Sequence, residues 1–175
     1  QEPDYNLTDH GTLKNSRKDY DYTNYEEDVF VGYRYFASFA VPVSYPFGYG
    51  LSYTSFTYSD AAIAQKADSY EVSVKVTNSG KAEGKEVEEL YYSDPQNKTL
   101  NKPVFELKAY AKTRSLKPGE SETVKLTVKA ADLASFDTSS SSWVVSAAEG
   151  KFLIGSSSED IRATLTAKVK ASSQK

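Results

Sequence analysis

Cysteine is absent from this chain of 175 residues, and histidine and tryptophan each occur once. The lack of cysteine excludes disulfides and thiolate metal sites, and it suits a bacterial protein of the cytoplasm, or one that is periplasmic or secreted. A Ser-His-Asp triad would have to use His10, which lies in a polar lead segment without helix or strand periodicity. We therefore interpret His10 as an exposed loop residue.

Long apolar runs and clusters of one charge are lacking as well. No stretch reaches the roughly 18 apolar residues that a membrane-spanning helix needs, so we expect no membrane contact. The 21 Lys and Arg residues are scattered among 24 Asp and Glu residues, and the net charge is −3, so we expect no nucleic-acid partner. The run GSSS at 155–158 lacks a following lysine and is no phosphate-binding loop, and no cofactor is expected.

The first 54 residues do not resemble a domain of their own. Residues 1–30 are polar, rich in Asp, Asn and Tyr, and predict a loop. The run VFVGYRYF (29–36) fits either a short strand or a helical turn. Residues 45–54, YPFGYGLSYT, form an uncharged segment that we call the strap. Its glycines permit positive φ angles or a close approach of the backbone to its neighbours.

From residue 55 onward the pattern changes to alternation of apolar and polar residues. Seven or eight short strands separated by turn residues predict an antiparallel β-sandwich. One helical turn is expected at 130–137, and Trp143 is expected in the core. The expected strands lie within 55–60, 69–80, 85–95, 104–116, 121–130, 142–147, 151–158 and 161–170.

Several stretches together resemble the C-terminal half of family 3 glycoside hydrolases. They are EEDVFVGYRYF (26–36), YPFGYGLSYTSF (45–56), VTNSGKAEGKEVEELYYSDP (76–95), FELKAYAKTRSLKPGESETVKLTV (105–128), DLASFD (132–137), WVV (143–145) and FLIGSSSEDI (152–161). The resemblance implies a mainly β, fibronectin type III-like (immunoglobulin-like) antiparallel β-sandwich at 55–170. It makes 1–54 the end of an α/β sandwich domain plus an interdomain strap, and it leaves 171–175 as a frayed tail.

The resemblance also implies a function. Such enzymes hydrolyse terminal β-linked glucose or similar sugars with retention, using a nucleophilic Asp in a barrel domain and an acid/base Glu in the α/β domain. No residue here matches either motif, so no catalytic residue and no metal site are assigned, and whether the chain is itself an enzyme stays open. The expected partners are the missing barrel and α/β catalytic domains, on the same parent chain or a second one. The carbohydrate substrate is reached through the parent, and a dimer is conceivable.

The aromatic residues before the sandwich are the candidate site. The resemblance gives them an interdomain packing role, although their rings also suit stacking on sugars. An alternative function is a free-standing carbohydrate-binding or interaction module without catalysis, and a third is an inert structural domain. The residues are Tyr33, Tyr35, Phe36, Tyr45, Phe47, Tyr49 and Tyr53.

Local acidic residues and Arg34 have plainer interpretations. Glu26, Glu27 and Asp28 fit a solvated loop, and a calcium site that adds Asp19 and Asp21 lacks the spacing of an EF-hand. Glu86 and Glu88 would share one strand face about 6–7 Å apart, which is common on sheet surfaces. We interpret Arg34 as a structural hydrogen-bond donor.

Two positions depart from the family pattern. In VEELYY (87–92), Glu88 shares a face with Leu90 and Tyr92, where an apolar residue is usual. A buried unpaired carboxylate would cost several kcal/mol or stay protonated. We therefore hypothesise that this face is partly solvated or that Glu88 meets a cation. In SAAEGKF (146–152), the turn type is open because the glycine is displaced.

Overall fold

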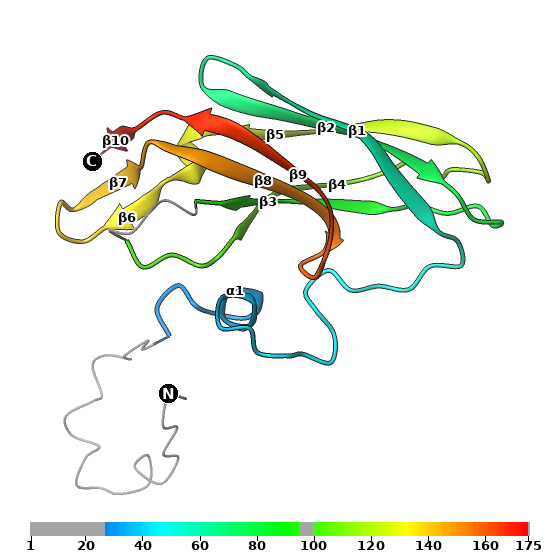
Figure 1. Ribbon diagram of the computed structural model, residues 1–175, viewed down its shortest axis with the longest axis horizontal. Coiled ribbons are helices and arrows are strands. Elements are labelled where there is room, and N and C mark those ends of the chain that lie inside the picture. The colour runs from blue at the N-terminus through cyan, green and yellow to red at the C-terminus, as the bar shows by residue number, and fades with distance from the viewer. Residues whose placement is uncertain (1–26, 95–99, 175) are drawn as a thin grey trace, which may run out of the picture.

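The computed structural model describes residues 27–94 and 100–174 (Figure 1). The predictions for His10, Asp19, Asp21 and Glu26 lie outside these residues. Two antiparallel sheets form the body of the chain, with strand orders β1-β2-β5 and β4-β3-β8-β9. The strands are β1 (Phe56–Gln65), β2 (Ser69–Asn78), β3 (Val87–Ser93), β4 (Glu106–Lys112), β5 (Ser121–Lys129), β8 (Ala148–Ser157) and β9 (Asp160–Val169). The predicted mainly β antiparallel sandwich is confirmed.

The remaining elements are small. A six-residue helix, α1 (Tyr33–Ser38), precedes the sandwich, so the helical alternative for this stretch is the right one. A 3-10 turn, η2 (Ala130–Leu133), fulfils the predicted helical turn, and it puts Leu133 into the core. A third sheet has the order β10-β7-β6, from β6 (Ser135–Asp137), β7 (Ser142–Val145) and β10 (Ser172–Gln174). Thus three residues of the expected frayed tail pair with β7.

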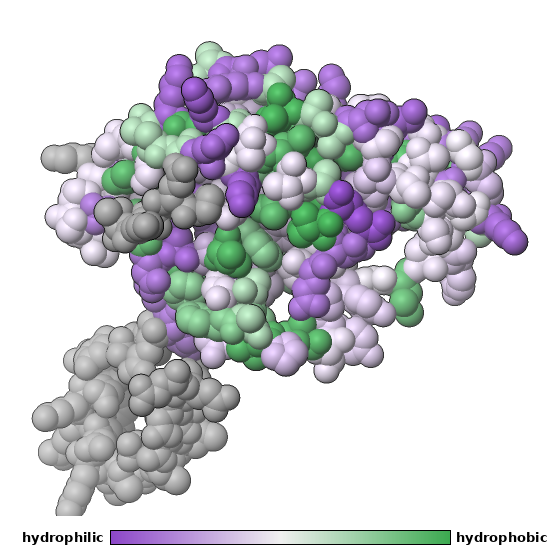
Figure 2. All heavy atoms as spheres, viewed as in Figure 1, coloured by the Kyte–Doolittle hydropathy of each residue, from purple (hydrophilic) through white to green (hydrophobic). Residues whose placement is uncertain are grey.

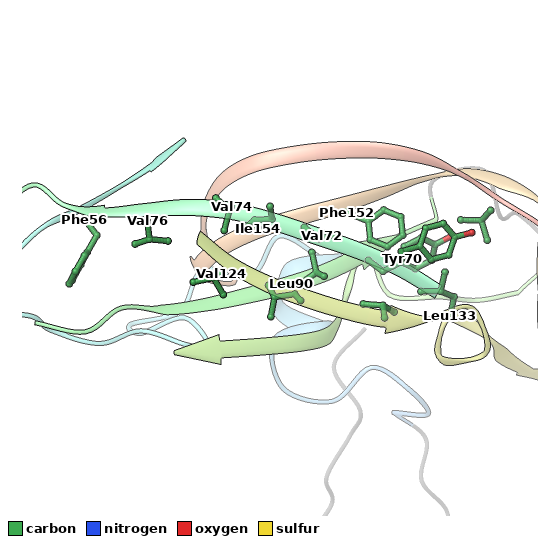
Figure 3. Packing of buried hydrophobic residues seen from close by; sticks show 14 of the residues in the cluster. Phe56, Tyr70, Val72, Val74, Val76, Leu90, Val124, Leu133, Phe152 and Ile154 are labelled. Carbon is green, nitrogen blue, oxygen red and sulfur yellow. The ribbon is translucent and has the colours of Figure 1, made fainter. Parts of the chain in front are cut away.

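The core lies between the two main sheets. Alternation in β2 points Tyr70, Val72, Val74 and Val76 inward, since successive side chains of a strand face opposite sides of the sheet. They meet inward side chains of β3, β5 and β8, as Figure 3 shows. The facing sheet contributes Leu90, Tyr92, Phe152 and Ile154, and β5, which lies beside β2 in the same sheet, adds Val124, Leu126 and Val128.

β3 departs from simple alternation because both of its faces are covered. Every residue from Glu88 to Ser93 is buried. Leu90 and Tyr92 belong to the core between the sheets, whereas Tyr91 packs against Tyr33 of α1 on the opposite face. In Figure 1, α1 lies beneath β3, on the side away from β2. The chain before the sandwich therefore forms a partial third layer over this sheet.

The prediction that Trp143 lies in the core is wrong. Its side chain is 52% exposed and packs edge-on against Phe136, with ring centroids 5.5 Å apart. β7 belongs to the small sheet, and it turns Ser142 and Val145 inward instead. The sequence pattern cannot fix this, because the phase of a four-residue strand is set by its neighbours. Gly150, in the run of open turn type, lies within β8 against Tyr92.

The hypothesis that Glu88 is solvated or paired with a cation is wrong. Its side chain does share the inward face with Leu90, but it is 0% exposed. Neither carboxyl oxygen has a hydrogen-bond partner within the described part of the chain. Burial raises the pKa of Glu88 to about 8, and the nearby Glu86 carboxylate acts in the same direction. Glu88 is therefore a protonated, buried acid near neutral pH.

We predict that Glu88→Val stabilises the chain, and more so at pH 8 than at pH 5. The folded pKa of about 8 lies above the ordinary pKa of a glutamate, about 4.5. Between pH 4.5 and about pH 8, the folded protein therefore binds more protons than the unfolded protein. As the pH rises through this range, Glu88 lowers the free energy of unfolding. The difference between wild type and variant should grow by a few kcal/mol. Urea unfolding at a series of pH values measures it.

The control is Glu159→Gln, at an exposed position beyond β8. It should reproduce the wild-type dependence of stability on pH. A Glu88→Val protein that is much less stable than wild type at both pH values would contradict this account, because it would show that Glu88 has a stabilising partner.

Candidate functional site

Tyr33 fixes α1 to the outer face of the four-stranded sheet. Its hydroxyl accepts a hydrogen bond of 2.7 Å from the backbone N–H of Leu107 in β4. Its ring centroid lies 4.8 Å from that of Phe47 in the strap, 5.8 Å from that of Tyr91 and 6.2 Å from that of Phe105. Aromatic pairs at these separations attract one another beyond their area burial. One side chain thus joins the helix, the strap and the sheet.

Two further contacts tie α1 to the segment that leads into β4. The Ser38 hydroxyl accepts a hydrogen bond of 3.0 Å from the backbone N–H of Val104. Arg34 Nη1 lies 3.9 Å from Glu106 Oε1, a partly exposed ion pair that contributes little by itself. Arg34 thus has an acidic neighbour, but at 3.9 Å the contact is longer than a hydrogen bond, so its role as a hydrogen-bond donor stays a prediction.

The strap begins with a tight turn that only glycine suits. The backbone N–H of Tyr49 donates to the carbonyl of Pro46 at 3.0 Å, and Gly48 at the third turn position has a φ of 83°. A Cβ atom on Gly48 would lie 2.4 Å from Oε2 of Glu89. The Phe47 carbonyl accepts from the Ser158 N–H at 2.8 Å, which ties the turn to the end of β8.

The carboxyl group beneath Gly48 is buried. Glu89 Oε2 accepts a hydrogen bond of 2.6 Å from the Tyr91 hydroxyl. Burial raises the pKa of the Glu89 carboxyl, and the Tyr91 hydrogen bond opposes that rise. Burial, followed by that same hydrogen bond, raises the pKa of Tyr91. The two groups satisfy each other under the strap, and we assign them a structural role.

The opposite side of α1 and the strap is open to solvent. Tyr45 is 71% exposed, Leu51 89% and Tyr53 100%. Figure 2 shows hydrophobic residues gathered over α1 and the neighbouring chain. We call this surface the outer face, and it comprises Val31, Phe36, Phe39, Tyr45, Leu51 and Tyr53. Leu51 also borders the groove between strap and sandwich, and Tyr49, although half exposed, lines that groove.

The seven aromatic residues singled out in the sequence therefore divide into two groups. Tyr33 and Phe47 pack toward the sandwich, and Tyr35 packs against Phe36 and Phe39. Phe36, Tyr45, Tyr49 and Tyr53 are exposed, and Phe47 is 44% exposed although its ring packs on Tyr33. The sequence analysis missed Val31, Phe39 and Leu51 on the outer face, although the glycines beside Val31 and Leu51 were a usable signal.

A groove of about 780 Å³ separates the strap from the end of the sandwich. The strap forms one wall, the turn from β8 to β9 forms another, and the start of β3 lies at its floor. Charges of both signs line it, from Lys85, Lys112, Arg162, Glu86, Glu159 and Asp160. A smaller dent of about 140 Å³ lies between α1 and the strap.

Glu86 and Glu88 do not form a catalytic carboxyl pair in the groove. Glu86 lines it, but Glu88 is sealed in the core, so the two cannot act together on a substrate. Across residues 27–94 and 100–174, no group of three or more His, Cys, Asp or Glu side chains could hold a metal ion. In the same ranges, no helix has the length and apolar character to cross a membrane.

Comparison with known proteins defines the class first. Residues 86–158 match the fibronectin type III-like domain family, so the sandwich is a domain of that kind. The chain is 42% identical over 180 residues to β-glucosidase A of Butyrivibrio fibrisolvens, covering 89% of this chain and 21% of that protein. It is 43% identical over 146 residues to β-glucosidase BoGH3A of Bacteroides ovatus, covering 81% and 19%.

Solved structures agree. β-Glucosidase 3B of Thermotoga neapolitana, in complex with glucose, superposes with a TM-score of 0.81 at 45% identity, over 85% of this chain and 21% of that one. β-Glucosidase of Kluyveromyces marxianus, also in complex with glucose, gives 0.80 at 38% identity, over 85% and 18%. The chain belongs to glycoside hydrolase family 3, as the C-terminal portion of such an enzyme. It spans about a fifth of the length of these relatives, so the parent enzyme has further domains.

We predict that Gly48→Ala destabilises the chain by about 1–3 kcal/mol, because the alanine would adopt a positive φ and press on the Glu89 carboxyl. Gly50→Ala is the matched control in the same strap, since a Cβ there meets nothing within 4 Å. Urea unfolding of both variants measures the difference. Equal stability of the two variants would show that the turn at Gly48 does not hold the strap in solution.

Proposed function

We propose that the outer face docks this chain onto the catalytic domains of its parent, and so stabilises them. The parent would be a β-glucosidase-type enzyme that hydrolyses terminal β-linked glucose or a similar sugar with retention of configuration. In this proposal residues 1–54 end the α/β sandwich domain and carry the strap, residues 55–170 form the fibronectin type III-like domain, and residues 171–175 are a tail. The barrel and α/β domains would lie on the same chain or on a second one.

This proposal rests on the exposure of the outer face to solvent. Tyr45, Leu51 and Tyr53 project from a strap whose other side is already held by Phe47 and Tyr33. Contiguous exposed apolar surface of this kind marks an interaction site in soluble proteins. Aromatic side chains are also enriched where interfaces are fully buried. The seven predicted aromatic residues would thus act in interdomain packing from both sides of the strap.

The contacts of α1 and the strap with the sandwich support the same proposal. The helix and strap make specific hydrogen bonds to the sandwich through Tyr33, Ser38 and Phe47. Family relatives of about five times this length supply the domains that would rest on the opposite side. A dimer of the parent enzyme is a further part of the same proposal.

We predict that Tyr53→Ser leaves the unfolding temperature of this chain nearly unchanged, because the side chain is fully exposed. In the natively purified parent enzyme, the same change should lower both the unfolding temperature and the hydrolysis of p-nitrophenyl β-D-glucoside. An interface position of this kind contributes about 1–2 kcal/mol. Calorimetry and the chromogenic assay measure the two effects, after an intact mass has shown whether the parent is one chain or two.

Trp143→Ser is the control, because Trp143 is a half-exposed aromatic residue that lies on the small sheet and not on the outer face. It should leave the glucosidase activity of the parent as it is. Unchanged stability and activity of the parent with Tyr53→Ser would contradict docking at this position. A native preparation that holds only a 19.3 kDa species without activity would favour the free-standing module.

A further inference from the structure

We propose that the groove between the strap and the sandwich is a saccharide-binding site. Its volume of about 780 Å³ lies within the range of small-molecule sites in proteins. The class of ligand follows from the groove lining. The choice of glucose units as the sugar rests on the proposed function.

The charges of the groove favour a neutral ligand. Three cationic and three acidic side chains line it, so the formal charges cancel. Arg162 and Asp160 form a two-point ion pair, and Asp160 also accepts a hydrogen bond of 2.7 Å from the Ser156 hydroxyl. These contacts hold the pKa of Asp160 below its usual range, with Arg162 as the main cause. Asp160 is thus a fixed acceptor, which suits a ligand rich in hydroxyl groups.

Small hydroxyl side chains supply further donors and acceptors. Ser52 and Ser157 line the groove, as does Thr54, whose hydroxyl already donates to Asn78 Oδ1 at 2.6 Å. The Ser52 Oγ accepts from the Thr54 N–H at 3.3 Å, and the Ser157 Oγ accepts from the Asp160 N–H at 3.1 Å. Each of these serine hydroxyls keeps its own proton for donation to a ligand. A sugar hydroxyl both donates and accepts, so it can use such a lining in full.

An aromatic wall completes the site. Tyr49 is half exposed at the groove, and its ring packs on Tyr45 with centroids 5.0 Å apart. The turn at Gly48 fixes the backbone of Tyr49. A tyrosine ring presents an apolar face that matches the C–H face of a pyranose, and it keeps a polar edge. Across the groove, Arg162 is held over the ring of Tyr58 at 5.6 Å, so its guanidinium is positioned in advance.

The test is a titration of the 15N-labelled 175-residue chain with glucose, cellobiose and cellotetraose, followed by amide NMR shifts. We expect saturable shifts in 48–54 and 156–162, the two walls of the groove. Tyr49→Ala should weaken binding about tenfold, which corresponds to about 1.4 kcal/mol. Tyr53→Ser is the matched control, because Tyr53 belongs to the same strap but does not line the groove, and its affinity should equal that of wild type.

Three results would overturn the proposal. They are the absence of saturable shifts with all three sugars, shifts confined to the Phe136 and Trp143 pair, and equal losses in the Tyr49 and Tyr53 variants. The wild-type shift map decides the matter even where Tyr49→Ala fails to fold. This titration uses no catalytic domain, so a lack of sugar binding would say nothing against docking of the outer face. Docking is tested separately, with the Tyr53→Ser variant of the parent enzyme.

Discussion

The burial of β3 on both faces is the constraint on which the rest of the structure depends. One face gives Leu90 and Tyr92 to the core between the sheets, and the other carries Glu89 and Tyr91. A sheet of a two-layer sandwich normally leaves one face to solvent. Here the outward face bears a carboxyl and a phenol that bond to each other at 2.6 Å, and α1 with the strap covers them. The segment before the sandwich is therefore part of the fold.

Because the strap covers the outward face of β3, its residues must fit closely against that face. Gly48 passes so close to Glu89 that a side chain would collide with the carboxyl group, and Phe47 turns inward onto Tyr33. The other large apolar side chains of the strap have no such contact with the sandwich core, and Tyr45, Leu51 and Tyr53 are exposed. The same geometry that closes the sandwich thus creates an exposed apolar surface, and a partner domain is the simplest way to bury it.

Alternation in the sequence predicted the regular strands, and β2 with its four inward apolar residues is a clear case. It also placed Glu88 on the face of Leu90, but it could not show that neighbouring strands seal that face. The prediction that Trp143 lies in the core was wrong for a related reason. In a short strand, the elements packed against it decide which side chains point inward. The strap aromatics stood out in the sequence as a candidate site, whereas the direction of each ring depends on a turn at Gly48 that periodicity does not describe.

The groove and the outer face share one structural element, and this has a thermodynamic consequence. A sugar in the groove would touch the strap and the sandwich together, so it would bind the docked strap better than a displaced one. Catalytic domains resting on the outer face would favour the same docked state. When two binding partners prefer the same state of one structural element, each raises the affinity of the protein for the other by the same factor. Saccharide binding should thus tighten the attachment of this chain to its parent, and attachment should raise the affinity for saccharide by the same factor.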